Sequence, residues 1–449
     1  IPVARALARR RFPGRGILVT LLGAPFLLPV IVAIFGLLAV FGRSGIFNAA
    51  TGFVGLPPVS IYGLHGVVLA HVFFNMPLAV RLILQGWAEI PGERLRLAAS
   101  LGFGPREMFR QLEWPMLKAI LPGALMIVFL ICLSSFAVAL TLGGGPAATT
   151  VELAVYQAFR FEFDLGRAAL LAMVQLALTA AAIMTALRLT VRAGFGAGLD
   201  RVVQRWDAAG RVLRVTDAAV IALAATFLLL PVVMVTVRGV PALTVVPDSV
   251  WPAALRSLLV AGGATCLTLA LALPIAIAAT RGRRIEAVGY LPVAASPMVI
   301  GTGLFLILFP LADPVALALP LTAAVNALMA LPFALRVLAP AAAGIETDYG
   351  RLADSLALTG AARMRWLVLP RLAPALGFAA GLTAALSIGD LGVVALIAAP
   401  GAETLPLLIQ RLMAAYRMDA AAGAALILLA VSFGVFRLLD GWGRARAAM

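Results

Sequence analysis

The sequence predicts an all-α, polytopic membrane protein made of two tandem repeats that run in parallel through the bilayer. Of its 449 residues, 63% are hydrophobic and 12% are charged, and the mean hydropathy is +1.05. Soluble domains have about 45–50% apolar and about 25% charged residues. The apolar residues form long continuous runs, which favours helical spans over the alternating strands of a membrane β-barrel. The third observation is an internal duplication, described below.

Ten runs are long enough to cross a bilayer, since a helical span needs about 20 mostly apolar residues. They occupy residues 17–41, 60–86, 119–142, 167–187, 215–237, 255–279, 286–309, 315–338, 374–398 and 418–438. If the runs alternate in direction, all but seven of the 35 basic residues fall on one side. The positive-inside rule makes that side cytoplasmic and places the C-terminus there. The net charge of +15 is then a topology signal and requires no nucleic acid.

The duplication is visible as a constant offset of 255 residues, at which Pro77 and Arg81 fall on Pro332 and Arg336. Parallel repeats of this kind occur in transporters, with a substrate path between the halves. We expect a first repeat at 1–187, a cytoplasmic linker at 188–214 and a second repeat at 215–449.

The second repeat starts with two apolar runs, 215–237 and 255–279, that have no counterpart in the first repeat. The expectation is a first repeat truncated at its N-terminus and about 12 spans in the natural protein.

Two cytoplasmic loops, at 89–118 and 345–371, contain acids and bases in nearly equal numbers. The positive-inside rule requires only bases, so a balanced loop that occurs twice indicates a partner at this face. Each loop has a helix-favouring segment followed by proline, at Pro115 and Pro370. We expect each helix to end before its proline and to lie along the membrane surface.

These loops resemble the EAA motif of permease subunits of bacterial ABC importers. The first reads Arg96-Leu97-Ala98-Ala99-Ser100-Leu101-Gly102, nine residues, then Leu112-Glu113-Trp114-Pro115; the second reads Arg351-Leu352-Ala353-Asp354-Ser355-Leu356-Ala357, nine residues, then Leu367-Val368-Leu369-Pro370. Arginine replaces the glutamate of the motif in both loops, and Ala357 replaces its glycine in the second.

The resemblance implies a type I ABC importer permease fold with a short coupling helix in each loop. The residues expected to couple to the ATPase are Arg96, Leu97, Ala98, Ser100, Gly102, Pro115, Arg351, Leu352, Ala353, Ser355, Ala357 and Pro370. The implied partners are two copies of a separate ATPase subunit and a periplasmic substrate-binding protein. No phosphate-binding Gly-x-x-x-x-Gly-Lys-Ser/Thr loop occurs in this chain, so any ATP must be bound by another chain.

Among duplicated permeases, the chain is most similar to the thiamine/thiamine pyrophosphate type. The similar stretches are Phe12-Pro13-Gly14-Arg15, Gly63-Leu64-His65-Gly66, the segment from His71 to Pro77, Leu112-Glu113-Trp114-Pro115, the segment from Leu142 to Pro146, Phe163-Asp164-Leu165-Gly166-Arg167 and the segment from Ser387 to Gly392. This resemblance implies transport of thiamine or its phosphates across the inner membrane.

Four polar residues within the spans are candidates for the substrate path: Asp390, His71, Asn75 and Asn326. Ionisable groups inside a membrane are usually functional or well paired. Asp390 lies between Gly389 and Gly392, so a helix cap and a substrate contact are equally open interpretations. For the other three, hydrogen bonding between helices is the favoured interpretation.

The leading function is an importer permease that works by alternating access in the lipid bilayer on a small-molecule substrate. The same architecture could serve ferric iron or a polyamine. A proton-driven secondary transporter is the alternative from another class, with only Asp390 and His71 available for proton transfer. The sequence contains no constellation typical of an enzyme or a metal site, so no cofactor or metal is expected.

Overall fold

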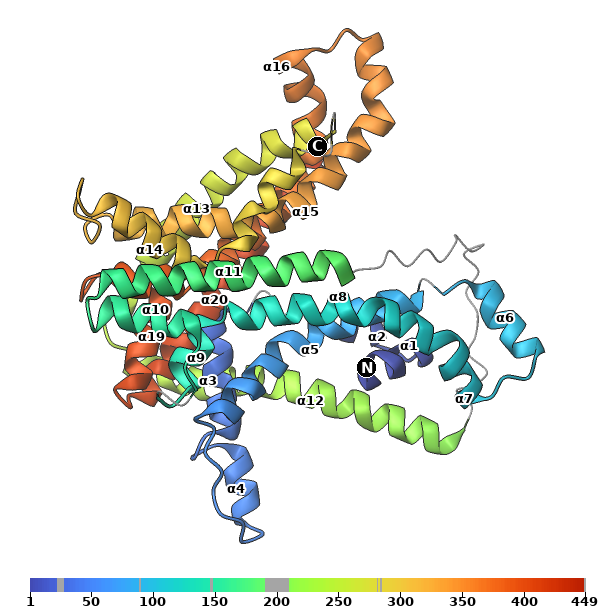
Figure 1. The fold of residues 1–449 in the computed structure, drawn as a ribbon, viewed down its shortest axis with the longest axis horizontal. Helices are drawn as coiled ribbons and strands as arrows, with labels where there is room; N and C mark the ends of the chain where they lie inside the picture. The colour runs from blue at the N-terminus through green and yellow to red at the C-terminus, as the bar shows by residue number, and fades with distance from the viewer. Residues whose placement is uncertain are drawn as a thin grey trace.

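The computed structural model describes residues 1–21, 28–88, 90–145, 148–189, 210–280, 282 and 285–447. Within these ranges the chain consists of helices joined by loops and contains no strand, which confirms the predicted all-α class (Figure 1). The predicted linker 188–214 falls mostly outside the described residues.

The helices of the first part of the chain are α1 (Pro2–Arg9), α2 (Arg15–Leu21), α3 (Val30–Phe41), α4 (Ile46–Gly52), α5 (Leu64–Ala88), α6 (Gly92–Ser100), α7 (Pro105–Met108), η2 (Phe109–Glu113), α8 (Trp114–Leu133), α9 (Phe136–Leu142), α10 (Val151–Arg160) and α11 (Leu165–Leu189). Those of the second part are α12 (Arg211–Ala242), η5 (Leu243–Val245), α13 (Val250–Ala279), η6 (Glu286–Ala294), α14 (Pro297–Leu308), α15 (Ala318–Ser355), α16 (Gly360–Arg363), η7 (Met364–Val368), α17 (Leu369–Ile388), α18 (Gly392–Ile397), α19 (Leu405–Ala414) and α20 (Met418–Ala447).

Nine helical segments in the described part of the chain are long and apolar enough to cross a membrane. They match nine of the ten predicted runs: Val30–Gly52, Leu64–Trp87, Pro105–Leu133, Leu165–Ala186, Arg211–Val245, Val250–Ala279, Ala318–Ser355, Gly360–Ile397 and Met418–Arg446. The tenth run, 286–309, is divided into the 3-10 helix η6 and the shorter helix α14. The division is physical: Ser296 caps α14, its Oγ accepting from the Val299 N–H at 3.3 Å, and Pro297 starts the new helix.

The duplication extends to the helix boundaries. At the offset of 255 residues, α7, η2 and α8 fall on α16, η7 and α17 residue for residue. The segment α5 to α6 corresponds to the single helix α15, and the difference has a local cause. Pro91 stands at the N-cap of α6, whereas the equivalent position in α15 is Glu346, which continues the helix.

The two loop prolines do not end helices, contrary to the prediction. Pro115 and Pro370 are each the second residue of a membrane helix, α8 or α17, directly after a π-helical turn. A proline in the first turn is tolerated because its missing N–H is not needed there, and the π turn shifts the hydrogen-bond register just before it.

The helices of these loops instead end at Gly102 and Ala357, which have φ angles of +66° and +53°. The N–H of the next residue, Phe103 or Leu358, donates to the oxygen of Ala98 or Ala353 at 3.0 and 2.9 Å. This pattern is the Schellman helix end, which glycine favours because it has no Cβ.

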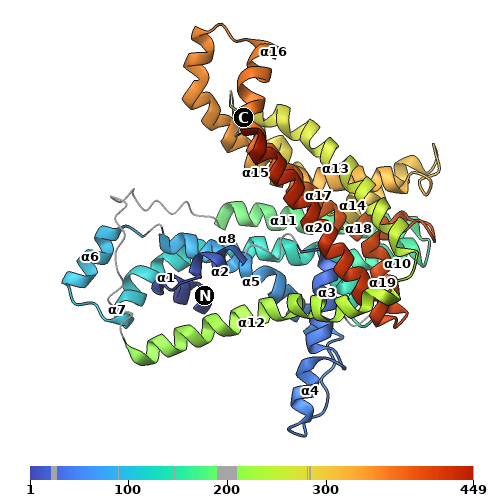
Figure 2. The same ribbon diagram turned by 180° about the vertical axis from the view of Figure 1, so that it is seen from behind.

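Helices from the two halves interleave. α12 packs on α1 and α3 of the first half and on α20 of the second, and α17 packs along α20 (Figure 2). Arg9 and Arg10 fix α1 to α12 by ion pairs of 2.9 and 2.8 Å with Asp217, which is almost fully buried. The two halves therefore form one packed body, with the small α6–α7 and α16 hairpins projecting from it at well-separated places (Figures 1 and 2).

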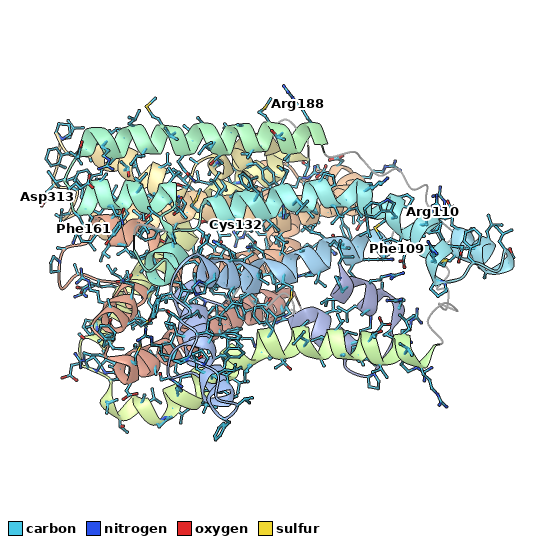
Figure 3. The ribbon with its side chains drawn as sticks, turned by 60° about the horizontal axis from the view of Figure 1, so that its bottom comes forward. Phe109, Arg110, Cys132, Phe161, Arg188 and Asp313 are labelled. Atoms are coloured by element: carbon cyan, nitrogen blue, oxygen red, sulfur yellow. The ribbon has the colours of Figure 1, made fainter. Side chains whose placement is uncertain are left out.

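Segments predicted to lie on opposite sides of the membrane are found at opposite ends of the molecule. Phe109 and Arg110 of the first loop and Arg188 lie toward one end, and Phe161 and Asp313 lie at the opposite end (Figure 3). The first three belong to segments predicted to be cytoplasmic and the last two to segments predicted to be external.

Candidate substrate cavity and coupling loops

A cavity of about 380 Å³ lies where the two halves meet. Its walls come from α3, α5, α8, α9 and α10 of the first half and from α14, α15, α17 and α18 of the second. All four polar candidates from the sequence, His71, Asn75, Asn326 and Asp390, line this one space. The structure thus brings together residues that are up to 319 positions apart in the chain.

Asp390 lies in the break between α17 and α18. Its carboxylate lies by the backbone N–H groups at the start of α18, those of Leu391, Gly392 and Val393. Its Oδ2 atom is buried and has no hydrogen-bond partner among the described residues. Both interpretations of Asp390 therefore have support: one side of the carboxylate faces a helix start, and the other is unsatisfied at the cavity.

The equivalent position in the first half is Ser135, in the matching break between α8 and α9. Both breaks contribute to the cavity wall.

His71 and Asn326 occupy equivalent positions in the two halves, and both reach the cavity. The Asn326 side chain donates to the Ser387 hydroxyl across helices at 2.9 Å. Asn75 donates to the His71 carbonyl of its own helix at 2.9 Å. Asn75 also donates to the Cys132 sulfur of α8 at 3.5 Å. The favoured interpretation of hydrogen bonding between helices thus describes both Asn326 and Asn75, and both residues still line the cavity.

Glu152 is a cavity residue, although it lies between the predicted runs 119–142 and 167–187 and not within a span. It stands in the first turn of α10, after Thr150, whose Oγ1 caps the helix by accepting from the Leu153 N–H at 3.3 Å. Glu152 is 1% exposed, and neither carboxylate oxygen has a hydrogen-bond partner within 3.5 Å among the described residues. The signal that could have revealed it is the helical periodicity of the segment 151–160, which buries Leu153, Val155 and Tyr156.

The charges on the cavity wall have one sign. Glu152 and Asp390 are its acidic residues, and none of the described lining residues is lysine or arginine. The rest of the lining is polar or apolar and includes the aromatic rings of Phe74, Phe136 and Phe333. Such a space favours a cation with apolar surface over an anion.

The coupling loops present equivalent exposed side chains. Leu97 and Leu101 of the first loop are 59% and 61% exposed, and Leu352 and Leu356 of the second are 54% and 61% exposed. Ser100 and Ser355 both turn back and donate to the carbonyl three residues earlier at 2.8 Å. Arg96, Arg351, Pro115 and Pro370 are also exposed.

Ala98 and Ala353 are buried inside their own loops, at 3% and 1% exposure. These alanines accept the bonds that close the helix ends, so the exposed side chains of each loop include its leucines but not these alanines.

The two coupling loops differ at one equivalent position, which holds an ion-paired side chain in one loop and a buried apolar side chain in the other. In the second loop Arg363 bridges Glu346 and Asp354 at 2.8 and 2.9 Å. In the first loop the same position is Met108, which is fully buried. The first loop is also tied to the body through Glu113, which pairs with Arg5 at 2.7 Å and accepts from the Trp87 ring N–H at 3.4 Å.

A duplicated bundle of apolar helices around a shared polar cavity, with a repeated surface loop, defines a membrane transport permease. Over 452 residues the chain is 40% identical to the Thiamine transport system permease protein ThiP of Brucella abortus strain 2308, covering 98% of the chain and 83% of that protein. It is 40% identical to the protein of the same description from Salmonella typhimurium strain LT2 and 39% identical to that of Escherichia coli K12, with 98% of the chain and 84% of each relative covered.

The chain therefore belongs to the family of thiamine transport system permease proteins. The resemblance inferred from the sequence motifs is confirmed, and the chain is a multi-pass protein of the inner membrane. No protein-family profile matches the chain, and no solved structure matches it.

Proposed function

We propose that this chain is the membrane-spanning subunit of an ABC importer and passes thiamine or its phosphates into the cell. The observation that carries this proposal is the cavity shared by both halves, with two carboxylates, several aromatic rings and no lysine or arginine among its described lining residues. Thiamine has a fixed positive charge on its thiazolium ring and aromatic surfaces, which such a cavity suits. The relatives, named for thiamine transport, support the same substrate.

The proposed path contains Asp390, His71, Asn75 and Asn326, which the sequence selected and which line this cavity. The mechanism is alternating access: the two halves rock about the cavity and open it first to the outside and then to the cytoplasm. The chain performs no covalent chemistry. A periplasmic binding protein delivers the substrate, and the C-terminus is cytoplasmic.

Two copies of a separate ATPase supply the energy, one at each coupling loop. Exposed leucine pairs on a small, well-formed hairpin are typical of an anchor for a hydrophobic groove. The rigid closure of each hairpin, by Met108 in one loop and by Arg363 in the other, lets it act as a lever on α8 or α17. Lipid surrounds the spans, and no nucleic acid is involved.

The test is transport by the reconstituted system. Permease, ATPase and binding protein are placed in proteoliposomes, and uptake of labelled thiamine is measured with and without ATP. We expect uptake that requires ATP. Uptake driven by a proton gradient without ATP would favour a secondary transporter, and uptake of ferric iron or spermidine in place of thiamine would change the substrate.

The coupling surface is tested by the double variant Leu97→Glu, Leu352→Glu. Two charges in the proposed hydrophobic contacts should abolish capture of the ATPase and ATP-dependent uptake. The matched control is Leu311→Glu, since Leu311 is also highly exposed, at 78%, but lies in the turn beside Asp313, away from both loops. Normal assembly by the double variant would show that these leucines do not contact the ATPase.

A further inference from the structure

Glu152 occupies a position that packing alone does not explain. It is an acid at 1% exposure on the cavity wall, it has no ion-pair partner in the described part of the chain, and its two oxygens lack hydrogen-bond partners there. The Ser296 hydroxyl is a neighbouring group; it accepts from the Val299 N–H and keeps its own O–H to donate towards Glu152, but it supplies no positive charge. A buried ionised carboxylate without a partner is strongly disfavoured unless it takes up a proton or a ligand supplies positive charge.

Asp390 is the second acid at this place, and it is close enough to Glu152 for the two charges to repel each other. Its Oδ2 is likewise buried and without a partner among the described residues. Two like charges facing one space make the unliganded site unfavourable, and a single cation between them neutralises one of the two charges and relieves their mutual repulsion.

We propose that Glu152 and Asp390 together bind the positively charged ring of the transported molecule, with one carboxylate supplied by each half of the chain. The proposal rests on the proposed function, because the thiazolium ring of thiamine is the cation that this function brings into the cavity. Phe136 and Phe74 also line this cavity and supply aromatic rings for a cation. Thiamine and its phosphates share this ring, so all of them can bind at the site. Any phosphate group would lie away from the two carboxylates.

The two carboxylates lie on elements that would move when the two halves of the chain move relative to each other. Glu152 is held on α10, which packs on α14 and α18, and Asp390 precedes α18. Arg160, at the other end of α10, donates to the Ala398 carbonyl just after α18 at 3.2 Å. A movement of the second half that displaces α18 therefore acts on both carboxylates and on the distance between them.

The experiment measures binding directly. The permease–ATPase assembly is put in nanodiscs without binding protein, and labelled thiamine is titrated against wild type, Glu152→Gln, Asp390→Asn, Glu152→Asp and the control Glu162→Gln. Glu162 is an exposed external carboxylate that pairs with Arg167, outside the cavity. We expect Glu152→Gln and Asp390→Asn each to weaken thiamine binding about tenfold or more, Glu152→Asp to retain most of it, and Glu162→Gln to bind like wild type.

The uncharged oxidation product thiochrome serves as the charge probe. It should bind weakly to wild type and be unaffected by Glu152→Gln. A Glu152→Gln assembly that still captures the ATPase and binds thiamine as wild type does would overturn the proposal. If wild type binds spermidine but not thiamine, and Glu152→Gln weakens spermidine binding, the proposed substrate fails and the cation site stands; a wild type that binds neither refutes both.

Discussion

The left-handed backbone at Ala357 offers a quantitative test of the second coupling loop. Both loops end their helix in the same Schellman geometry, but the first uses Gly102 at φ +66° and the second uses Ala357 at φ +53°. An L-residue with a Cβ pays about 1–2 kcal/mol for this conformation. Glycine avoids that strain but has more backbone freedom in the open loop, worth about 0.5–1 kcal/mol. The substitution Ala357→Gly should therefore stabilise the closed loop by about 1 kcal/mol.

The reciprocal substitution Gly102→Ala should destabilise the first loop by the same amount. A Cβ built on Gly102 meets no atom within 4 Å, so the expected effect comes from the backbone and not from a clash. The two variants are therefore matched perturbations of opposite sign.

The assay is native-state hydrogen exchange at the amides that close each helix end, those of Phe103 and Leu358. These amides donate to Ala98 and Ala353 and exchange only when the loop opens. Since 1.4 kcal/mol is a factor of about ten, exchange at Leu358 should slow about fivefold in Ala357→Gly, and exchange at Phe103 should accelerate about fivefold in Gly102→Ala. Amides within α17 serve as the control. Shifts of the same sign in both variants, or no shift, would refute the assignment of strain to Ala357.

Two further predictions concern the loops and the topology. Methionine stands at the position of the first loop that is equivalent to Arg363. The substitution Arg363→Met should lower the stability of the second loop by less than about 1 kcal/mol, because surface ion pairs are weak. It should also abolish the salt dependence of hydrogen exchange in that loop, and unchanged salt dependence would contradict the role of this pair. In a background without Cys132 and Cys266, a cysteine at Asp313 should react with an impermeant thiol reagent added outside, and a cysteine at Arg110 should react only after permeabilisation; the opposite labelling would invert the topology.

The repeat and the loops could be predicted because their signals are local in the sequence. At the constant offset of 255 residues, α7, η2 and α8 have the same lengths as α16, η7 and α17. For example, α8 and α17 begin and end at the same distances from Pro115 and Pro370. The expected helix end at these prolines was wrong, because a π turn before each proline lets the helix continue into the membrane. The residue that ends the helix is Gly102 or Ala357, and alanine gives no sequence signal for a left-handed backbone.

The cavity could be predicted only in part. Asp390, His71, Asn75 and Asn326 stand out in a sequence because polar groups are rare in apolar spans. Glu152 does not stand out, because it follows a turn in a short segment too mixed to span a membrane. Its inward orientation depends on the packing of α10 against α14 and α18, which are more than a hundred residues away in the chain.

The two acids occupy positions that are not equivalent in the two repeats, which is possible because the repeats are fused in one chain. The counterpart of Asp390 in the first half is Ser135, and the counterpart of Glu152 in the second half is Leu407. A symmetric pair of identical chains would carry each acid twice or not at all. Two acids around one cation leave one negative charge unneutralised, whereas four acids would leave three, a repulsion that one substrate charge cannot relieve. Independent change in the two halves thus allows each to contribute a single carboxylate, which places an asymmetric substrate in a defined orientation between them.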